Sequence, residues 1–141
     1  MASRSPITYY LPFGCGYALL WPSASTKACF HLFLFIQEFL HGNLGRFTWA
    51  LDVQIDISDP ARTTATGTGV LTAANGDGLF TRFTAFATNT ETPDVLFITE
   101  FHTITGGTGR FAGATGTFTR EALSNLALGF SFGSFDGFIS Y

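Results

Sequence analysis

Two ionisable residues in one segment are the first candidates for chemistry. Glu100 and His102 lie two residues apart in the apolar segment 95–105, and in a β-strand residues at that spacing point to the same face. Ionisable groups on an apolar face are costly unless they are paired. A buried histidine and a carboxylate have tunable pKa values, so together they can hold and transfer a proton.

Arg82 is the expected third member of this site. If segments 79–88 and 95–105 form a hairpin in which paired residue numbers sum to 182 or 184, Arg82 lies directly or diagonally opposite Glu100 on the same face. The three groups could then polarise a carbonyl or an epoxide. The apolar residues expected to line the ligand are Phe80, Phe86, Leu96 and Ile98. The alternative is a structural ion pair or a polar rim.

Metal and nucleotide chemistry find less support. Cys15, Cys29, His31 and His41 lack the close paired spacing of structural zinc sites. The glycine-dense run 103–116 misses the dinucleotide-binding spacing by one residue and is followed by a strand-like segment rather than a helix start. No cofactor or metal is therefore expected.

The segments that position these residues read as β-strands. Residues 46–57 alternate strictly between apolar and polar side chains, which is typical of a half-buried strand. Asn75-Gly76 is the strongest hairpin signal in the chain and predicts a two-residue type I′ turn. Further strands are expected at 79–88, 95–105, 116–122 and 128–141. We expect one all-β domain, an antiparallel up-and-down barrel of eight strands, since closure removes the sheet edges.

The N-terminal part is less regular. Residues 28–40 suit either a helix or a strand, and their aromatic content favours a strand. Residues 9–20 would then form the first strand or an arm that covers an edge. The apolar run 28–36 is too short to span a membrane as a helix. A secretory signal is only weakly indicated, so the compartment stays open.

Composition limits the partners. The 141-residue chain has a net charge of −3 and no cluster of Lys or Arg, which argues against a nucleic-acid surface. Only 12% of residues are charged whereas 16% are aromatic, with seventeen Phe. The chain must hide much apolar surface, either in a cavity, in a subunit interface, or in both. The charge-poor segment 1–51 predicts a homo-oligomer.

The glycine-dense run is also where a family resemblance appears. The five glycines in this short run suit a sharp corner between two strands. The sequence Gly106-Gly107-Thr108-Gly109-Arg110-Phe111 resembles a corner of allene oxide cyclase-like and dirigent-like barrels. The segments 44–48, 71–77 and 133–141 resemble the strand entry, central hairpin and closing strand of bacterial barrels of this type. The resemblance covers residues 42–141.

The resemblance implies a calycin-like barrel, usually trimeric, that binds a small hydrophobic and unsaturated molecule. Such barrels steer cyclisation by shape and water exclusion, without a covalent nucleophile or cofactor. We therefore expect a hydrophobic-ligand barrel that can act as an isomerase or cyclase. The alternative is a non-catalytic oligomeric barrel whose interior is filled by its own Phe side chains. Whether the protein is an enzyme is left open by the sequence.

Overall fold

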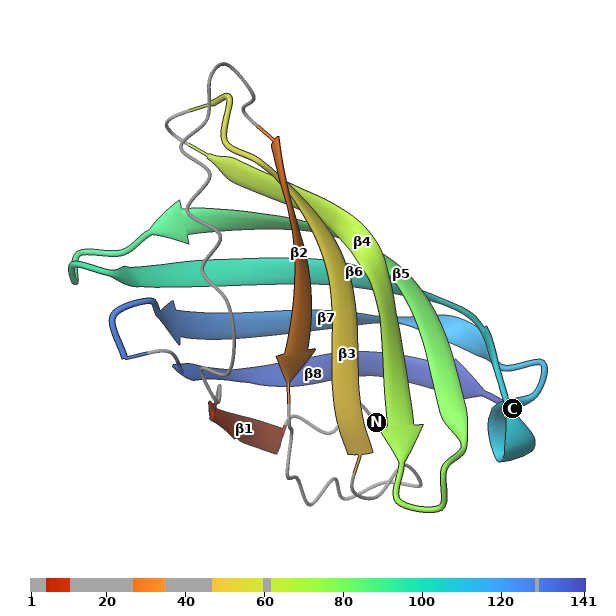
Figure 1. The fold of residues 1–141 in the computed structure, drawn as a ribbon. Helices are drawn as coiled ribbons and strands as arrows, with labels where there is room; N and C mark the ends of the chain where they lie inside the picture. Colours follow the sequence, from red (N-terminus) through yellow and green to blue (C-terminus); the bar gives the residue numbers. More distant parts are fainter. Residues whose placement is uncertain (1–4, 11–26, 35–46, 60–61, 129) are drawn as a thin grey trace.

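The fold is a single curved antiparallel sheet (Figure 1). The structure is a computed structural model that describes residues 5–10, 27–34, 47–59, 62–128 and 130–141. The strands are β1 (Ser5–Tyr10), β2 (Lys27–Leu34), β3 (Phe47–Asp56), β4 (Thr63–Ala73), β5 (Gly78–Asn89), β6 (Val95–Gly107), β7 (Thr115–Asn125) and β8 (Phe130–Ser140). A short 3₁₀ turn, η1 (Gly109–Phe111), lies between β6 and β7.

The topology is up-and-down. Strands β2 to β7 each pair with the next strand in the chain, and β1 pairs with β8, so the order is β1-β8-β7-β6-β5-β4-β3-β2. The expected all-β antiparallel meander is confirmed. Within the described residues β1 and β2 form the two edges and no β1–β2 ladder closes the sheet. Closure into an eight-stranded barrel therefore stays a prediction.

The concave face carries the core because side chains alternate along each strand. In β3, Phe47, Trp49 and Leu51 are buried whereas Thr48 and Asp52 are exposed, as the alternation in 46–57 predicts. The buried cluster continues over β4, β5, β6 and the corner before β7 with Leu71, Ala73, Leu79, Phe83, Ile104, Phe111 and Ala114. Strands β3 to β8 thus share one apolar inner face.

The β4–β5 hairpin lies where the sequence predicts it but has another turn. Only Gly76 has positive φ, at 89°, and Asn75 does not, which rules out type I′. The amide of Gly76 donates to the carbonyl of Ala73, and the amide of Ala73 donates to the carbonyl of Asp77. This is the pattern of a three-residue loop with a left-handed glycine. Asn75 instead braces the loop through side-chain bonds with Asp77.

The register between β5 and β6 differs from the prediction. Paired residue numbers sum to 185 from Thr81 to Asn89, so Arg82 lies opposite Thr103 and Phe83 lies opposite His102. A register shift between Phe80 and Thr81 marks a bulge. Because the sum is odd, Arg82 lies on the face opposite to Glu100. The expected pairing of Arg82 with Glu100 is therefore wrong.

The glycine-dense run does form a corner between strands. Gly106, Gly109, Gly113 and Gly116 all have positive φ, which a residue with a Cβ rarely adopts. The corner is tied to the β4–β5 hairpin, since the Thr108 amide donates to the Gly78 carbonyl and the Gly78 amide donates to the Thr108 hydroxyl. The ring of Phe111 is buried in the core below.

The N-terminal expectations are covered only in part. Segment 27–34 is a strand, β2, as its aromatic content favours, while residues 35–40 lie outside the described residues. Strand β1 begins at Ser5, earlier than the expected segment 9–20, most of which is not described. Cys15 and His41 also lie outside the described residues. In the part of the chain that is described, no helix is long and apolar enough to cross a membrane.

Candidate functional site

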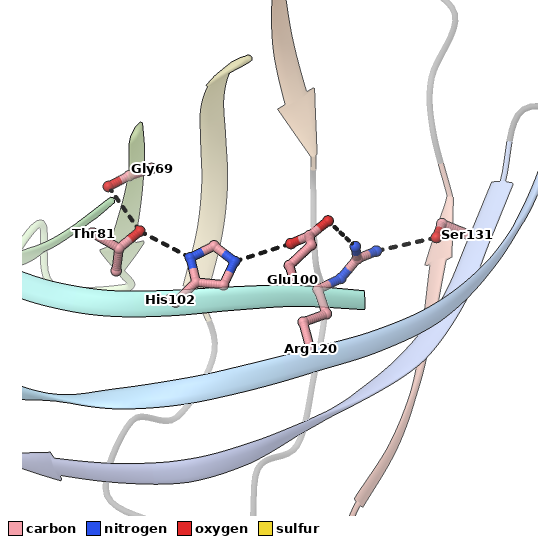
Figure 2. Close-up of polar contacts among 6 residues, drawn as sticks. All are labelled: Gly69, Thr81, Glu100, His102, Arg120 and Ser131. Atoms are coloured by element: carbon pink, nitrogen blue, oxygen red, sulfur yellow. Dashed lines mark hydrogen bonds and ion pairs between the residues drawn. The ribbon is translucent and has the colours of Figure 1, made fainter. Parts of the chain in front are cut away.

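A chain of polar side chains crosses the inner face of the sheet (Figure 2). It runs from β4 through β5, β6 and β7 to β8, and the side chains that form it are buried. In order across the sheet its members are the Gly69 carbonyl, Thr81, His102, Glu100, Arg120 and Ser131. Charge and hydrogen-bonding capacity are thus concentrated inside an otherwise apolar face.

Glu100 and Arg120 form the centre of this polar chain. They are directly opposite on β6 and β7, and Arg120 Nη1 donates to Glu100 Oε1 at 2.5 Å. Arg120 Nη2 donates to the Ser131 hydroxyl at 3.1 Å. That hydroxyl lies 2.7 Å from the Ser124 hydroxyl, its cross-strand neighbour. The ion pair is therefore supported by hydrogen bonds toward β8.

His102 continues the polar chain toward β5. Its Nε2 lies 3.0 Å from Glu100 Oε2, and its Nδ1 lies 3.2 Å from the Thr81 hydroxyl. The ring is stacked on Phe118 with centroids 4.4 Å apart and an interplanar angle of 9°. Phe83 and Trp49 contact it as well, with centroids 4.9 and 5.1 Å away. An aromatic cage thus encloses the imidazole.

The protonation states follow from burial and from these contacts. Burial lowers the pKa of His102 more than the neighbouring Glu100 raises it, so the imidazole is neutral. Burial raises the pKa of Glu100, but Arg120 and the bond to His102 together outweigh it, and the net pKa is lowered. Glu100 is therefore ionised. A carboxylate only accepts hydrogen bonds, so Nε2 of His102 carries the proton and Nδ1 accepts from the Thr81 hydroxyl. Because that hydroxyl has a single proton, it does not donate to the Gly69 carbonyl, 3.5 Å away, at the same time.

This arrangement limits acid and base chemistry. Both nitrogens of His102 and both oxygens of Glu100 are already hydrogen-bonded. Each carboxylate oxygen keeps a second lone pair, and the Glu100 side chain is 8% exposed whereas that of His102 is fully covered. The group can therefore accept a hydrogen bond from a ligand more readily than it can move a proton.

The structure brings together two of the three predicted site residues. Glu100 and His102 lie side by side on the inner face, as their spacing predicts. Arg82 is exposed on the outer face, and Arg120 pairs with Glu100 in its place. A signal for Arg120 existed in the sequence, because it alternates with Phe118 and Ala122 and so shares their apolar face.

The predicted ligand-lining residues also divide between the two faces. Leu96 and Ile98 alternate with Glu100 on the inner face and are half-buried. Phe80 is exposed. Phe86 points outward too, and the centroid of its ring lies 6.1 Å from that of Phe101. The odd register sum of the β5–β6 hairpin is the reason, since it places even-numbered residues of β5 outside.

Ser131 belongs to a motif that our sequence reasoning missed. It is the serine of a Gly-Phe-Ser-Phe-Gly sequence at 129–133, which has the spacing of a hydrolase nucleophile. That chemistry needs a sharp strand-to-helix turn that exposes the serine. Here Ser131 lies in β8, is buried, and bonds to Arg120 and Ser124. The motif therefore lacks the required context.

The inner face changes in character along the strands. At the end near the β4–β5 hairpin its side chains are large and fully buried, among them Trp49, Leu79 and Phe111. Beyond the polar chain, toward the β5–β6 turn, the inward residues are mostly small or aliphatic and half-buried. These are Val53, Ile55, Ala65, Ala85, Ala87, Leu96 and Ile98, with the buried Ala122 beside them. We call this set the small-residue end.

A small void lies at the end of the inner face near the β4–β5 hairpin. It has a volume of about 10 Å³ and is lined by Phe47, Leu71, Ala73, Leu79 and Phe111. That space holds about one water molecule, and its lining is apolar. It therefore does not belong to the polar chain. Within the described residues no three His, Cys, Asp or Glu side chains are grouped so as to hold a metal ion.

Comparisons with protein-family models, with curated proteins and with solved structures found no match to this chain.

Proposed function

We propose that this protein binds a small hydrophobic molecule at the small-residue end of its inner face, with a polar group of the ligand against Glu100. The observation that carries the proposal is the change along the inner face. Large side chains fill the end near the β4–β5 hairpin, whereas the end near the β5–β6 turn has small side chains and is only half-buried. The buried ion pair lies between the two ends. Apolar walls with a few placed polar groups are typical of small-molecule sites.

The buried ion pair supports a binding role. Removing two charges from water costs several kcal/mol per ion, and mutual attraction offsets this only with good geometry. A filled apolar core would avoid that cost. Glu100 retains accepting capacity beside the small-residue end, so a ligand hydroxyl or amide could donate to it. The fixed charge would then orient an otherwise apolar molecule.

We propose in addition that the sheet closes into a barrel of the allene oxide cyclase-like or dirigent-like type. Pairing of β1 with β8 is the ladder that an up-and-down barrel needs, and the remaining gap lies between β1 and β2. Residues 42–141 resemble allene oxide cyclase-like and dirigent-like barrels, in which an enclosed shape steers ring closure. Since the nitrogens of His102 are occupied, an isomerase or cyclase activity here would rest on shape and desolvation rather than on proton transfer.

A binding assay with linoleyl alcohol as probe tests this function, because its hydroxyl can donate to Glu100. Ala85 faces inward at the small-residue end, and its neighbour Thr84 faces outward and is exposed. Ala85→Phe should fill the site and weaken binding at least tenfold, while Thr84→Phe should leave it unchanged. Titration calorimetry measures both. Equal affinities in the two variants, or no binding to the unaltered protein, would contradict the proposal.

A second candidate is a non-catalytic barrel that its own rings fill. The packing of Trp49, Phe83 and Phe118 around His102 favours it. In this case the polar chain serves only folding. Ala85→Phe would then change the stability of the fold, and no apolar probe would bind to the interior of either the variant or the unaltered protein.

A further inference from the structure

The outer face of strands β5 to β8 carries an unusual row of exposed apolar side chains. Phe97, Leu123 and Phe132 are direct cross-strand neighbours on β6, β7 and β8, and they are 36%, 43% and 42% exposed. Phe101 lies two residues from Phe97 on β6 and is 50% exposed. Contiguous exposed apolar surface of this kind marks interaction sites rather than ordinary solvent surface.

Few charges interrupt this face, and two of them are placed symmetrically. Arg82 lies opposite Thr103 on β5, and Glu121 lies opposite Thr99 on β7. Relative to Phe101, Arg82 is one strand and two residues away in one direction, and Glu121 is one strand and two residues away in the reverse direction. With strands about 4.8 Å apart and about 3.4 Å per residue, each charge lies about 8 Å from Phe101.

Both charges are available to a partner. The side chains of Arg82 and Glu121 are exposed, and within the described residues neither side chain forms a hydrogen bond or an ion pair. An arginine and a carboxylate on either side of an aromatic residue can be matched by the same surface turned about a two-fold axis. These two charges are therefore complementary to each other across such an axis, and Asp136, opposite Thr119 on β8, is a third charge of the same face.

We propose that this outer face binds a second copy of the chain about a two-fold axis through Phe101. The axis lies between the two faces and is perpendicular to the line from Arg82 to Glu121. Each Arg82 then meets Glu121 of the other copy, and the Phe101 rings meet at the centre. The same rotation places Phe80, on β5 at one corner of the outer face, against Phe132 of the other copy, which lies on β8 at the opposite corner. Exposed apolar residues at both corners are thereby covered.

The arrangement has the features of a specific interface. An aromatic residue at the centre, enclosed by a charged or polar margin, is typical of the residues that contribute most to association. Complementary charges at the margin fix the orientation and exclude other arrangements. The contact uses the outer face only, so it is independent of the ligand proposed for the inner face.

Charge reversal tests the symmetry directly. The variants R82E and E121R each place like charges at both pairs, so each alone should sediment as a monomer of 15.2 kDa. The unaltered chain should sediment at twice that mass at micromolar concentration. An equimolar mixture of the two variants restores both attractive pairs and should form a heterodimer, as should the doubly reversed variant with itself. The control E91R makes the same charge change in the exposed turn after β5 and should remain dimeric.

Other outcomes would overturn the proposal. A monomeric unaltered protein, or a trimer, is incompatible with this two-fold contact. Dimers that survive both reversals would place the interface elsewhere. A mixture that stays monomeric would show that Arg82 and Glu121 do not meet. Circular dichroism of each variant confirms that the fold is retained, which is expected since both side chains are exposed.

Discussion

Glu100 and Arg120 occupy directly opposite positions on β6 and β7, and their ion pair is buried inside the sheet. The pair joins the two halves of the polar chain, with His102 and Thr81 on one side and Ser131 on the other. Its burial means that each charge depends on the other.

Loss of Arg120 should be far more costly than loss of Arg82. Arg120→Met leaves an uncompensated buried carboxylate and should lower the free energy of unfolding by about 3–5 kcal/mol. Arg82→Met changes a side chain that is exposed on each chain and should lower it by less than about 0.5 kcal/mol at protein concentrations too low for the proposed dimer. Urea denaturation measures both. In the double variant Glu100→Gln with Arg120→Met, the amide oxygen still accepts from His102, so part of the loss should return. Equal effects at the two arginines would contradict the observed register.

The stability of the fold should decrease as the pH falls. Because the pKa of His102 is lowered from 6.5 by burial, the unfolded chain takes up that proton first. The free energy of unfolding should therefore be highest above pH 6.5 and fall below it. The lowered pKa of Glu100 adds a second loss once the pH drops under 4.5. Each group contributes a slope of at most about 1.4 kcal/mol per pH unit.

Urea denaturation between pH 7.5 and pH 5 checks this prediction. His102→Gln should flatten the dependence around pH 6, while His31→Gln or His41→Gln should leave the contribution of His102 in place. A stability that rises as the pH falls through this range would show that the folded state favours the protonated imidazole, contrary to the effect of its burial.

Gly69 should not tolerate a methyl group. A Cβ at this position would lie 2.7 Å from Trp49 Nε1 and 2.8 Å from the Thr81 hydroxyl. The indole is buried and its N–H has no partner within the described residues, so it has little room to move. Gly69→Ala should cost about 1–3 kcal/mol by overpacking. Thr68→Ala, at the exposed neighbouring position, is the control and should cost much less. A stabilised Gly69→Ala protein would mean that the inner face is more loosely packed than described.

The β4–β5 turn should depend on Gly76 through its backbone alone. A Cβ there would meet nothing within 4 Å, but φ is +89°. Gly76→Ala should therefore lower the thermal midpoint by the equivalent of about 1 kcal/mol. Ala74→Ser in the same loop should have little effect. An unchanged melting temperature for Gly76→Ala would argue for a different turn.

The period of two along a strand explains what the sequence could predict. It placed Glu100 and His102 on one face because no bulge separates them. The same period correctly predicted the strand at 46–57 and the antiparallel order of the strands that follow. The position of Arg82 required the register of a hairpin, and that depends on the number of residues in the 90–95 turn, where Asp94 adopts a positive φ of 60°. An even count makes the register sum odd and reverses the face.

The small-residue end was not visible from any single segment. Ala65, Ala85 and Ala122 come from three strands, and each is an unremarkable alanine in its own sequence context. They come together on one face only through the registers of β4 with β5, of β5 with β6 and of β6 with β7. The change in size along the inner face is thus a property of pairing rather than of composition.

A hydrophobic molecule that binds at the small-residue end must contact the alanine methyl groups there. Methyl NMR of protein labelled at alanine, titrated with linoleyl alcohol, detects that contact. We predict saturable shifts of the Ala65, Ala85, Ala87 and Ala122 methyl groups, with Ala112, an exposed residue of the glycine-dense corner, unchanged. If saturating probe leaves these four methyl groups unshifted, or shifts only residues of the outer face, the molecule does not bind at the small-residue end.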